Sequence, residues 1–194
     1  MAAAGDILIC NTALGSHLGS RRINSFEESS VAARECRSFY DDWRRYLLYL
    51  RPWRFATKTV LLAELDVDSD VYQYVYQKPA DLLRPLSLIS PTTSEEVEVE
   101  YEITEQGLET DLYQAKLRYI ADIDDPAFFD EGFRVALGWL AAAHLAMPVG
   151  DSAEKQAAMW QGFYRALPPA TALNNSQARK EPQHRSRFNS ARRT

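Results

Sequence analysis

The stretch SFEESSVAARECRSFYDDWRRYLLYL (Ser25–Leu50), followed by Arg51 and Pro52, decides the fold class. Ser25 and Glu28 have the spacing of a capping box, in which two side chains satisfy backbone N–H groups at the start of a helix. Apolar residues then recur at alternating spacings of four and three, which is typical of one helix face. The positions of this predicted seam are Ala32, Cys36, Phe39, Trp43, Tyr46 and Leu50. A helix of about 40 Å is expected to end before Pro52, because proline disfavours helical backbone in the residue that precedes it.

Three further helices are predicted around this one. A short helix is expected over Asp6–Leu14, ahead of a glycine-containing loop. A third helix is expected to begin at Asp125, an N-cap followed directly by proline, and to end at Pro148 and Gly150. The fourth is expected to begin at Asp151 and to end at Pro168.

The segment between the second and third helices has the character of β-strands. Val, Leu, Thr and Tyr are frequent in residues 57–65, 71–76 and 86–89. Within residues 95–103, glutamate alternates with an apolar or aromatic residue from Glu96 onward, which predicts a strand with one wet face. Gly107 marks a turn, and residues 113–120 are expected to return as the pairing strand of a hairpin.

These patterns predict an α+β fold that is mainly α. An antiparallel helical bundle is expected from residues 1–55 and 121–169, with a small β-rich lobe of residues 56–120 inserted between its second and third helices. Residues 170–194 are expected to form an extended basic C-terminal tail. No apolar run approaches the roughly 20 residues of a membrane helix, so we expect no membrane association.

The net charge of −5 is divided unevenly along the chain. Residues 175–194 hold six basic residues and one acidic residue, a net charge of +5, which leaves −10 on the rest. A basic tail on an acidic body is expected to bind an acidic partner, with Phe188 as its apolar anchor. The residues assigned to this contact are Arg179, Lys180, Arg185, Arg187, Phe188, Arg192 and Arg193. The alternatives are a solubilising end, and a nucleic-acid-binding regulatory protein that uses this tail.

The alternating glutamates also have two interpretations. They are Glu96, Glu98, Glu100 and Glu102. Such a row is usually the solvent face of a strand. The alternative is a face turned toward a channel through which DNA passes, where charge repulsion keeps DNA from adhering.

The sequence contains no constellation typical of catalysis or of a metal or cofactor site. His17, His144 and His184 each lack a second ligand at a workable spacing. Cys10 and Cys36 lie apart from any Cys/His cluster and are expected to be buried free thiols. We therefore expect neither an enzyme nor a cofactor.

Three motifs, in order over about Asp6 to Leu173, carry a resemblance to a known family. The first is the turn after the long helix, with Pro52, Trp53, Phe55 and Ala56. The second is a tyrosine-rich segment followed by Pro79, Asp81 and Arg84. The third comprises Tyr119–Ile120, Asp125–Phe129 and the alanine-rich helix up to Pro148. Together they resemble the head–tail connector (adaptor) proteins of phages, of the tail tubular protein A type. Arg54 departs from the asparagine common in that family, and residues 94–105 match none of its patterns.

The resemblance implies a structural virion protein that forms a dodecameric ring below the portal. Such a ring extends the DNA channel, serves as the attachment platform for a tail nozzle or tail-tube protein, and passes DNA during genome ejection without sequence-specific binding. It also implies that the basic tail residues named above bind the portal and that the four glutamates line the DNA channel. The expected location is the head–tail interface of the virion, and the host cytoplasm during assembly.

Overall fold

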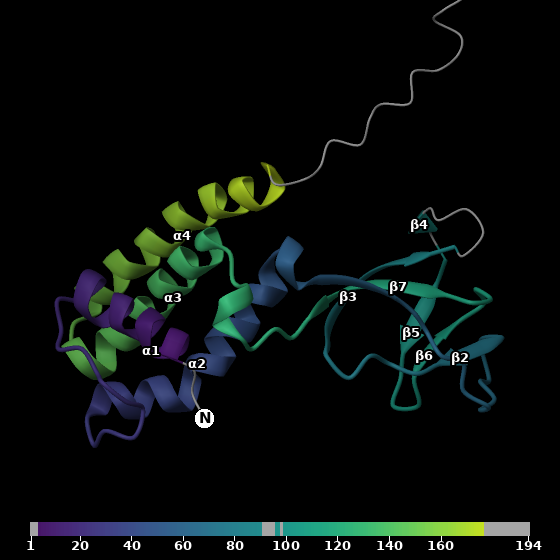
Figure 1. The fold of residues 1–194 in the computed structure, drawn as a ribbon, viewed down its shortest axis with the longest axis horizontal. Coiled ribbons are helices and arrows are strands. Elements are labelled where there is room, and N and C mark those ends of the chain that lie inside the picture. Colours follow the sequence, from purple (N-terminus) through teal and green to yellow (C-terminus); the bar gives the residue numbers. More distant parts are fainter. Residues whose placement is uncertain (1–3, 91–95, 98, 177–194) are drawn as a thin grey trace, which may run out of the picture.

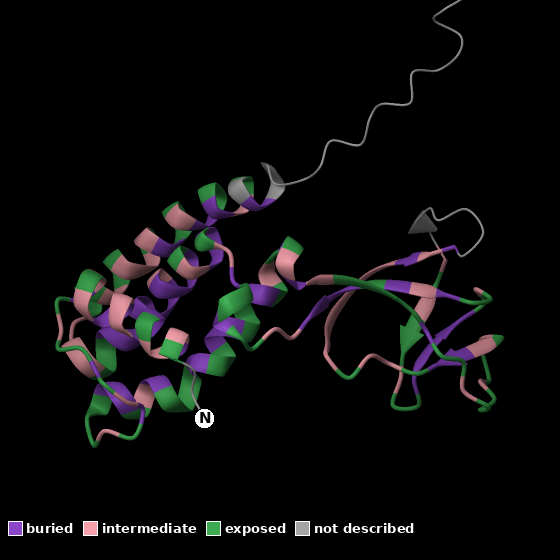
Figure 2. Ribbon diagram, in the orientation of Figure 1, coloured by how far each residue is buried: buried purple, intermediate pink, exposed green. Residues whose placement is uncertain are grey.

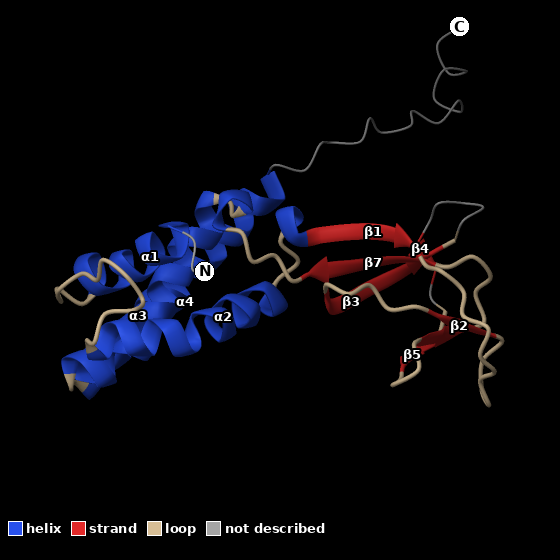
Figure 3. Cartoon of the chain, turned by 60° about the horizontal axis from the view of Figure 1, so that its bottom comes forward, coloured by secondary structure: helices blue, strands red, loops and turns tan. Residues whose placement is uncertain are grey.

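The computed structural model describes residues 4–90, 96–97 and 99–176, which form four α-helices and two small antiparallel sheets (Figure 1). The prediction of a chain that mixes helix and sheet is confirmed. The helices are α1 (Ala4–Asn11), which continues into a π-helical segment (Thr12–His17), α2 (Val31–Leu50), α3 (Glu131–Gly150) and α4 (Ala153–Ser176). The helices lie at one end of an elongated molecule and the strands at the other (Figure 3).

Every strand of the described residues lies in the chain between α2 and α3. They are β1 (Thr57–Leu61), β2 (Tyr74–Tyr76), β3 (Leu82–Ile89), β4 (Glu96–Val97), β5 (Tyr101–Ile103), β6 (Leu108–Thr110) and β7 (Lys116–Ala121). One sheet has the order β1-β7-β3-β4 and the other β2-β6-β5. Pairing of β1 with β7 begins at Thr57 opposite Ile120, where the chain enters and leaves the sheets.

Helix α2 ends at Leu50 as predicted, but it begins later than the capping box indicated. The true N-cap is Ser30, whose hydroxyl accepts from the backbone N–H of Ala33 at 3.2 Å. The predicted cap at Ser25 is wrong for the helix, although Ser25 does accept from the N–H of Glu27 at 3.1 Å. That bond instead helps to shape a turn ahead of α2, and this turn places Phe26 in the core.

The buried stripe of α2 is rotated from the predicted seam. Phe39 and Tyr46, expected in the core, are 45% and 48% exposed. Tyr40 and Leu47 occupy the core positions instead. A spacing of four and three fits both stripes, because they share Cys36 and Trp43, and tyrosine is polar enough to lie at either depth.

The last two helices begin at residues other than those predicted. Asp125 caps a 3-10 turn (Pro126–Phe128), and α3 begins after Asp130, which accepts from the N–H of Phe133 at 2.6 Å. Helix α3 continues through Pro148 and ends at Gly150, the second of the two residues predicted to end it, and its C-cap Asp151 has a left-handed backbone with φ of 44°. The hydroxyl of Ser152 then accepts from the N–H of Lys155 at 3.2 Å at the start of α4.

Helix α4 also continues past the prolines expected to end it. Pro168 and Pro169 are both exposed, and the hydroxyl of Thr171 donates to the carbonyls of Leu167 and Pro168. Beyond them Ala170 is buried, so burial offsets the hydrogen bonds that the prolines cannot donate. The predicted start of an extended tail at residue 170 is therefore wrong, because residues 170–176 are helical.

Two clusters of buried residues fill the molecule (Figure 2). The larger one joins the four helices with Trp53, Ala56 and Ile120. The smaller one, which includes Tyr76, Leu88 and Leu117, lies among the strands. Helix α3 is the centre of the larger cluster, since it packs against the other three helices.

The prediction that no segment is long and apolar enough to span a membrane is wrong for α3. Among the described residues, the helix Glu131–Gly150 is long enough and apolar enough to cross a membrane, judged by length and composition alone. However, 61% of its apolar window is buried inside the protein, as in the core helix of a globular fold.

Gly162 lets α3 and α4 approach each other. A Cβ added at this position would overlap the ring of Trp139 on α3. That ring is itself packed by His17, with ring centroids 3.8 Å apart, so it has little room to move.

We predict that Gly162→Ala lowers the free energy of unfolding by about 1–3 kcal/mol, the usual cost of overpacking a core. Urea denaturation followed by circular dichroism measures this loss. Gly150→Ala is the matched control, because a Cβ there would meet only the Lys155 Cδ at 3.9 Å. Equal stability of the two variants would contradict the proposed close packing.

Candidate interaction surfaces

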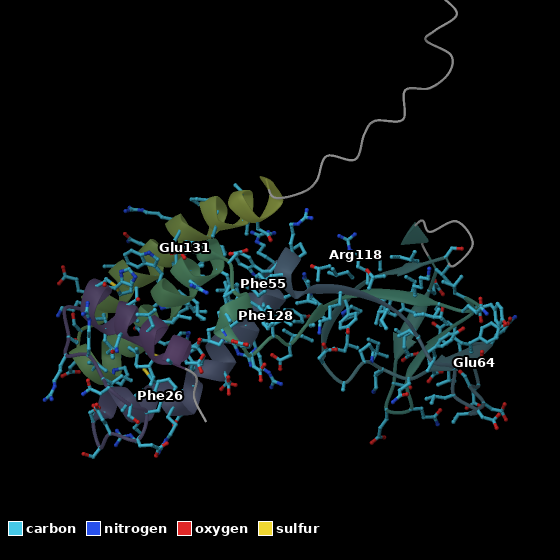
Figure 4. All side chains as sticks on the ribbon, viewed as in Figure 1. Phe26, Phe55, Glu64, Arg118, Phe128 and Glu131 are labelled. Carbon is cyan, nitrogen blue, oxygen red and sulfur yellow. The ribbon has the colours of Figure 1, made fainter. Side chains whose placement is uncertain are left out.

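The turn that connects α2 to β1 is anchored by aromatic packing. Trp53 is fully buried, and its indole Nε1 donates to the carbonyl of Leu47 at 2.8 Å. Phe55 lies between the helices and the sheets (Figure 4), with its ring 5.1 Å from that of Phe133 and 5.7 Å from that of Phe129. The first motif, which includes Pro52, therefore packs directly on the start of α3.

Asn174, near the end of α4, holds the same turn from another side. Its Oδ1 accepts from the backbone N–H of Arg54 at 2.8 Å, and its Nδ2 donates to the carbonyl of Pro52 at 3.2 Å. The side chain is buried, so both bonds are shielded from water. Sequence reasoning missed Asn174, because it follows two prolines in a segment of polar, tail-like composition.

At the sheet, the second motif contacts the third motif and Lys58, which lies just after the first motif. The carboxylate of Asp81 pairs with Lys58 of β1 at 2.6 Å and accepts from the hydroxyl of Tyr119 of β7 at 2.8 Å. Burial and this carboxylate raise the pKa of Tyr119 to about 12. The guanidinium carbon of Arg84 lies 5.3 Å from the ring centroid of Tyr49 on α2, a cation–π contact. Pro79 accepts from the N–H of Leu82 at 3.1 Å and so turns the chain into β3.

A charge network joins α2 to the segment that leaves β7. Asp122 contacts Arg44 Nη1 at 2.5 Å and Arg45 Nε at 2.6 Å through separate carboxylate oxygens. Arg44 is buried and also donates to the carbonyl of Ile123 at 2.5 Å. Burial of Asp122 opposes ionisation, but the bonds from Arg45 and Arg44 outweigh it and hold the pKa of the carboxyl below its ordinary value.

An open groove of about 720 Å³ lies where α2, α3 and α4 meet. Its residues are Glu35, Phe39, Asp42, Trp43, Tyr46, His144, Leu145, Pro148 and Trp160. Rings from the three helices form a continuous row, which we call the aromatic row. The neighbouring rings are Phe39 with Trp43 (6.4 Å), Trp43 with His144 (5.6 Å), His144 with Trp160 (5.2 Å) and Trp160 with Tyr164 (6.0 Å). The row exists because the buried stripe of α2 is rotated, which leaves Phe39 and Tyr46 facing outward.

The histidines of the described chain take part in aromatic packing. His144 stacks on Trp43 at an interplanar angle of 17°, and His17 stacks on Trp139 at 24°. Partial burial lowers the pKa of both imidazoles, so both are neutral near pH 7. His184 lies outside the described residues.

The predicted glutamate strand is not a single strand. Glu96 lies in β4 of the first sheet and Glu102 in β5 of the second, so the two residues belong to different sheets. Glu100 and Glu102 are exposed, whereas the side chain of Glu96 and the whole of Glu98 lie outside the described part. The predicted hairpin partner is also wrong, since residues 116–121 pair with β1 and β3. Gly107 does occupy a turn, which leads into β6.

The seven tail residues assigned to partner binding all lie in residues 177–194, outside the described part of the chain. Cys10 and Cys36 are free and buried, as predicted. A hydrogen bond with Cys36, together with burial, raises the pKa of the Cys10 thiol. Among the described residues, no group of three or more His, Cys, Asp or Glu is arranged to hold a metal ion.

We predict that Asp122→Asn destabilises the protein at pH 7 by roughly 3 kcal/mol, because it leaves the buried Arg44 with only the longer, 3.4 Å contact to the exposed carboxylate of Asp41. In the folded protein the pKa of Asp122 lies below the unfolded value of about 3.9. Its contribution is therefore present above that pH and is lost as the pH falls through the folded pKa. Urea unfolding over this range should show the difference between variant and wild type shrinking with acidity.

Asp124→Asn is the control for this prediction, because it removes an exposed carboxylate two residues away. A loss from Asp122→Asn that is the same at pH 7 and at about pH 3 would exclude the ion pair as its cause.

Comparison with models of known protein families finds no match, and no curated protein sequence matches the chain.

Proposed function

We propose that the chain is a phage head-to-tail adaptor, a structural virion protein that forms a ring, dodecameric as in the family it resembles, below the portal. One observation carries the proposal: the three motifs of the resemblance, separated along the chain, meet at a single junction. Phe55 of the first motif packs on Phe129 and Phe133 of the third. Asp81 of the second motif bonds to Lys58, just after the first, and to Tyr119 of the third.

Because the separated motifs meet at one junction, they share one physical role, which is to hold the helices and the sheets together. Residues that pack and bond to one another are constrained together, whereas unrelated surface segments are not. The junction sets how the helical end is attached to the sheets, which is the geometry that neighbouring subunits of a ring would have to share. This is the physical sense in which the three motifs support the family assignment.

The finer arrangement follows from the same proposal. The four helices act as an antiparallel bundle, and the β-rich lobe extends from it as a separate contact surface. In this arrangement the portal binds the basic tail, a tail nozzle or tail-tube protein binds the opposite side of the ring, and the acidic residues of the lobe face the DNA channel. The protein resides at the head–tail interface of the virion.

We predict that the triple variant Arg185→Ala, Arg187→Ala and Phe188→Ala weakens binding to isolated rings of the cognate portal by at least about tenfold, the loss expected for an interface hot spot. Surface plasmon resonance with immobilised portal measures this change. Arg165→Ala removes an exposed arginine of α4 and is the control. Unchanged portal binding by the triple variant would rule out the tail as the portal contact.

We also predict that Glu100→Lys with Glu102→Lys lowers the yield of infectious particles, because lysines on a channel wall attract DNA that should pass freely. Plaque assays and measurements of packaged DNA check this outcome. The control makes the same charge change on the helical end, with Asp124→Lys and Glu154→Lys. Infectivity as high in the lobe variant as in the control would identify the glutamates as a plain solvent face.

A further inference from the structure

The open groove crossed by the aromatic row has a surface chemistry suited to cationic side chains. Its described lining contains two carboxylates, Glu35 and Asp42, and neither Lys nor Arg. Asp42 is exposed, while Glu35 is half-buried and 3.7 Å from its neighbour Arg34. Guanidinium groups pair with carboxylates and also stack on aromatic faces, so arginine is the side chain that fits both features best.

The aromatic part of the groove is not explained by core packing alone. Phe39 and Tyr46 each leave nearly half of their surface in water, and Tyr164, which continues the aromatic row beyond the groove lining, is 65% exposed. Exposed apolar area that is continuous and bordered by charge is typical of an interaction site. Its composition favours a segment that presents arginines beside an aromatic residue.

We propose that the groove binds residues 177–194 of the same chain, with Arg185, Arg187 and Phe188 on the aromatic row. This segment has six basic residues and one acidic residue, and Phe188 is its one large apolar residue. It is therefore complementary to the groove in charge and in aromatic character. The inference concerns contacts within the chain, and it holds whatever external partner the segment also binds.

The length of the segment matches the distance that it must cover. Helix α4 ends at Ser176, at the end nearer the sheets, while Trp160 lies toward its beginning (Figure 1). At 1.5 Å per residue, these two positions are about 24 Å apart along the helix. Residues 177–184, if extended, span about 26 Å, which brings Arg185 to Phe188 back beside Trp160.

An intramolecular contact of this kind couples the groove to partner binding. A partner that takes up the basic segment must first displace it from the groove, so its apparent affinity is reduced by the fraction of time that the segment is bound there. Weakening the groove contact is therefore expected to make the segment more available.

The test replaces Phe188 in the full chain with the photo-reactive amino acid p-benzoylphenylalanine, which keeps an aromatic ring at that position. Illumination at low protein concentration, followed by mass spectrometry, is expected to give a monomeric product linked to the groove at Phe39, Tyr46 or Trp160. The yield should fall in about 1 M salt, where the screening length is about 3 Å.

A charge-reversal variant makes the test specific. Glu35→Lys with Asp42→Lys is expected to lower the yield of the linked product by at least about fivefold, through loss of two ion pairs and gain of repulsion. Asp42→Lys alone, at an exposed position, should give a smaller loss with no change in the circular dichroism spectrum. Asp124→Lys with Glu131→Lys reverses two charges elsewhere and should leave the yield unchanged. Links that are solely intermolecular, links outside the groove, or a yield indifferent to Glu35 and Asp42 would each overturn the proposal.

Discussion

The carboxylate of Asp122 binds two consecutive arginines of α2, and much of the molecule is positioned by this contact. Arg44 is buried, so its charge depends on its partners, which are Asp122 at 2.5 Å, the carbonyl of Ile123 and, at the longer distance of 3.4 Å, Asp41. The chain leaves the sheets at Asp122 and turns toward α3. The exit from the β-rich lobe is thereby fixed to the helix from which the lobe departs, and Trp53 fixes the entry on the same helix through Leu47.

The layout of the sheets follows from this double attachment. Because entry and exit are held together, the start of β1 lies beside the end of β7, with Thr57 opposite Ile120. The first sheet then grows outward from the junction, and the second sheet forms from the segments furthest from it (Figure 3). A strand that begins in one sheet and ends in the other must break between them, which is what happens between Glu96 and Glu102. Alternation of residue types sets which side chains share a face, but it does not determine which sheet a strand joins.

Local signals in the sequence were sufficient for the kinds of element and for several of their ends. Pro52 ends α2 and Gly107 turns the chain. Both effects could be predicted, because each depends on the backbone conformation of that residue and its neighbours alone. The start of α2 was ambiguous in the sequence, because both Ser25 and Ser30 are suitable N-cap residues. The candidate surfaces were harder to predict, because Arg44 and Asp122 are 78 residues apart and Asn174 lies 120 residues from Arg54. No spacing rule connects residues across such distances, and only tertiary packing explains why polar side chains are buried there.

Asn174 also has a mechanical consequence. A pull on the C-terminal segment acts first on the last turns of α4, and from there two hydrogen bonds lead to Pro52 and Arg54. Tension is thus transmitted to the junction between helices and sheets without passing through the centre of the helical core. The two prolines just before this point weaken the helix along its own axis, so the side-chain route carries a larger share of the load. The end of α4 therefore transmits force from the C-terminal segment to the junction between the helices and the sheets.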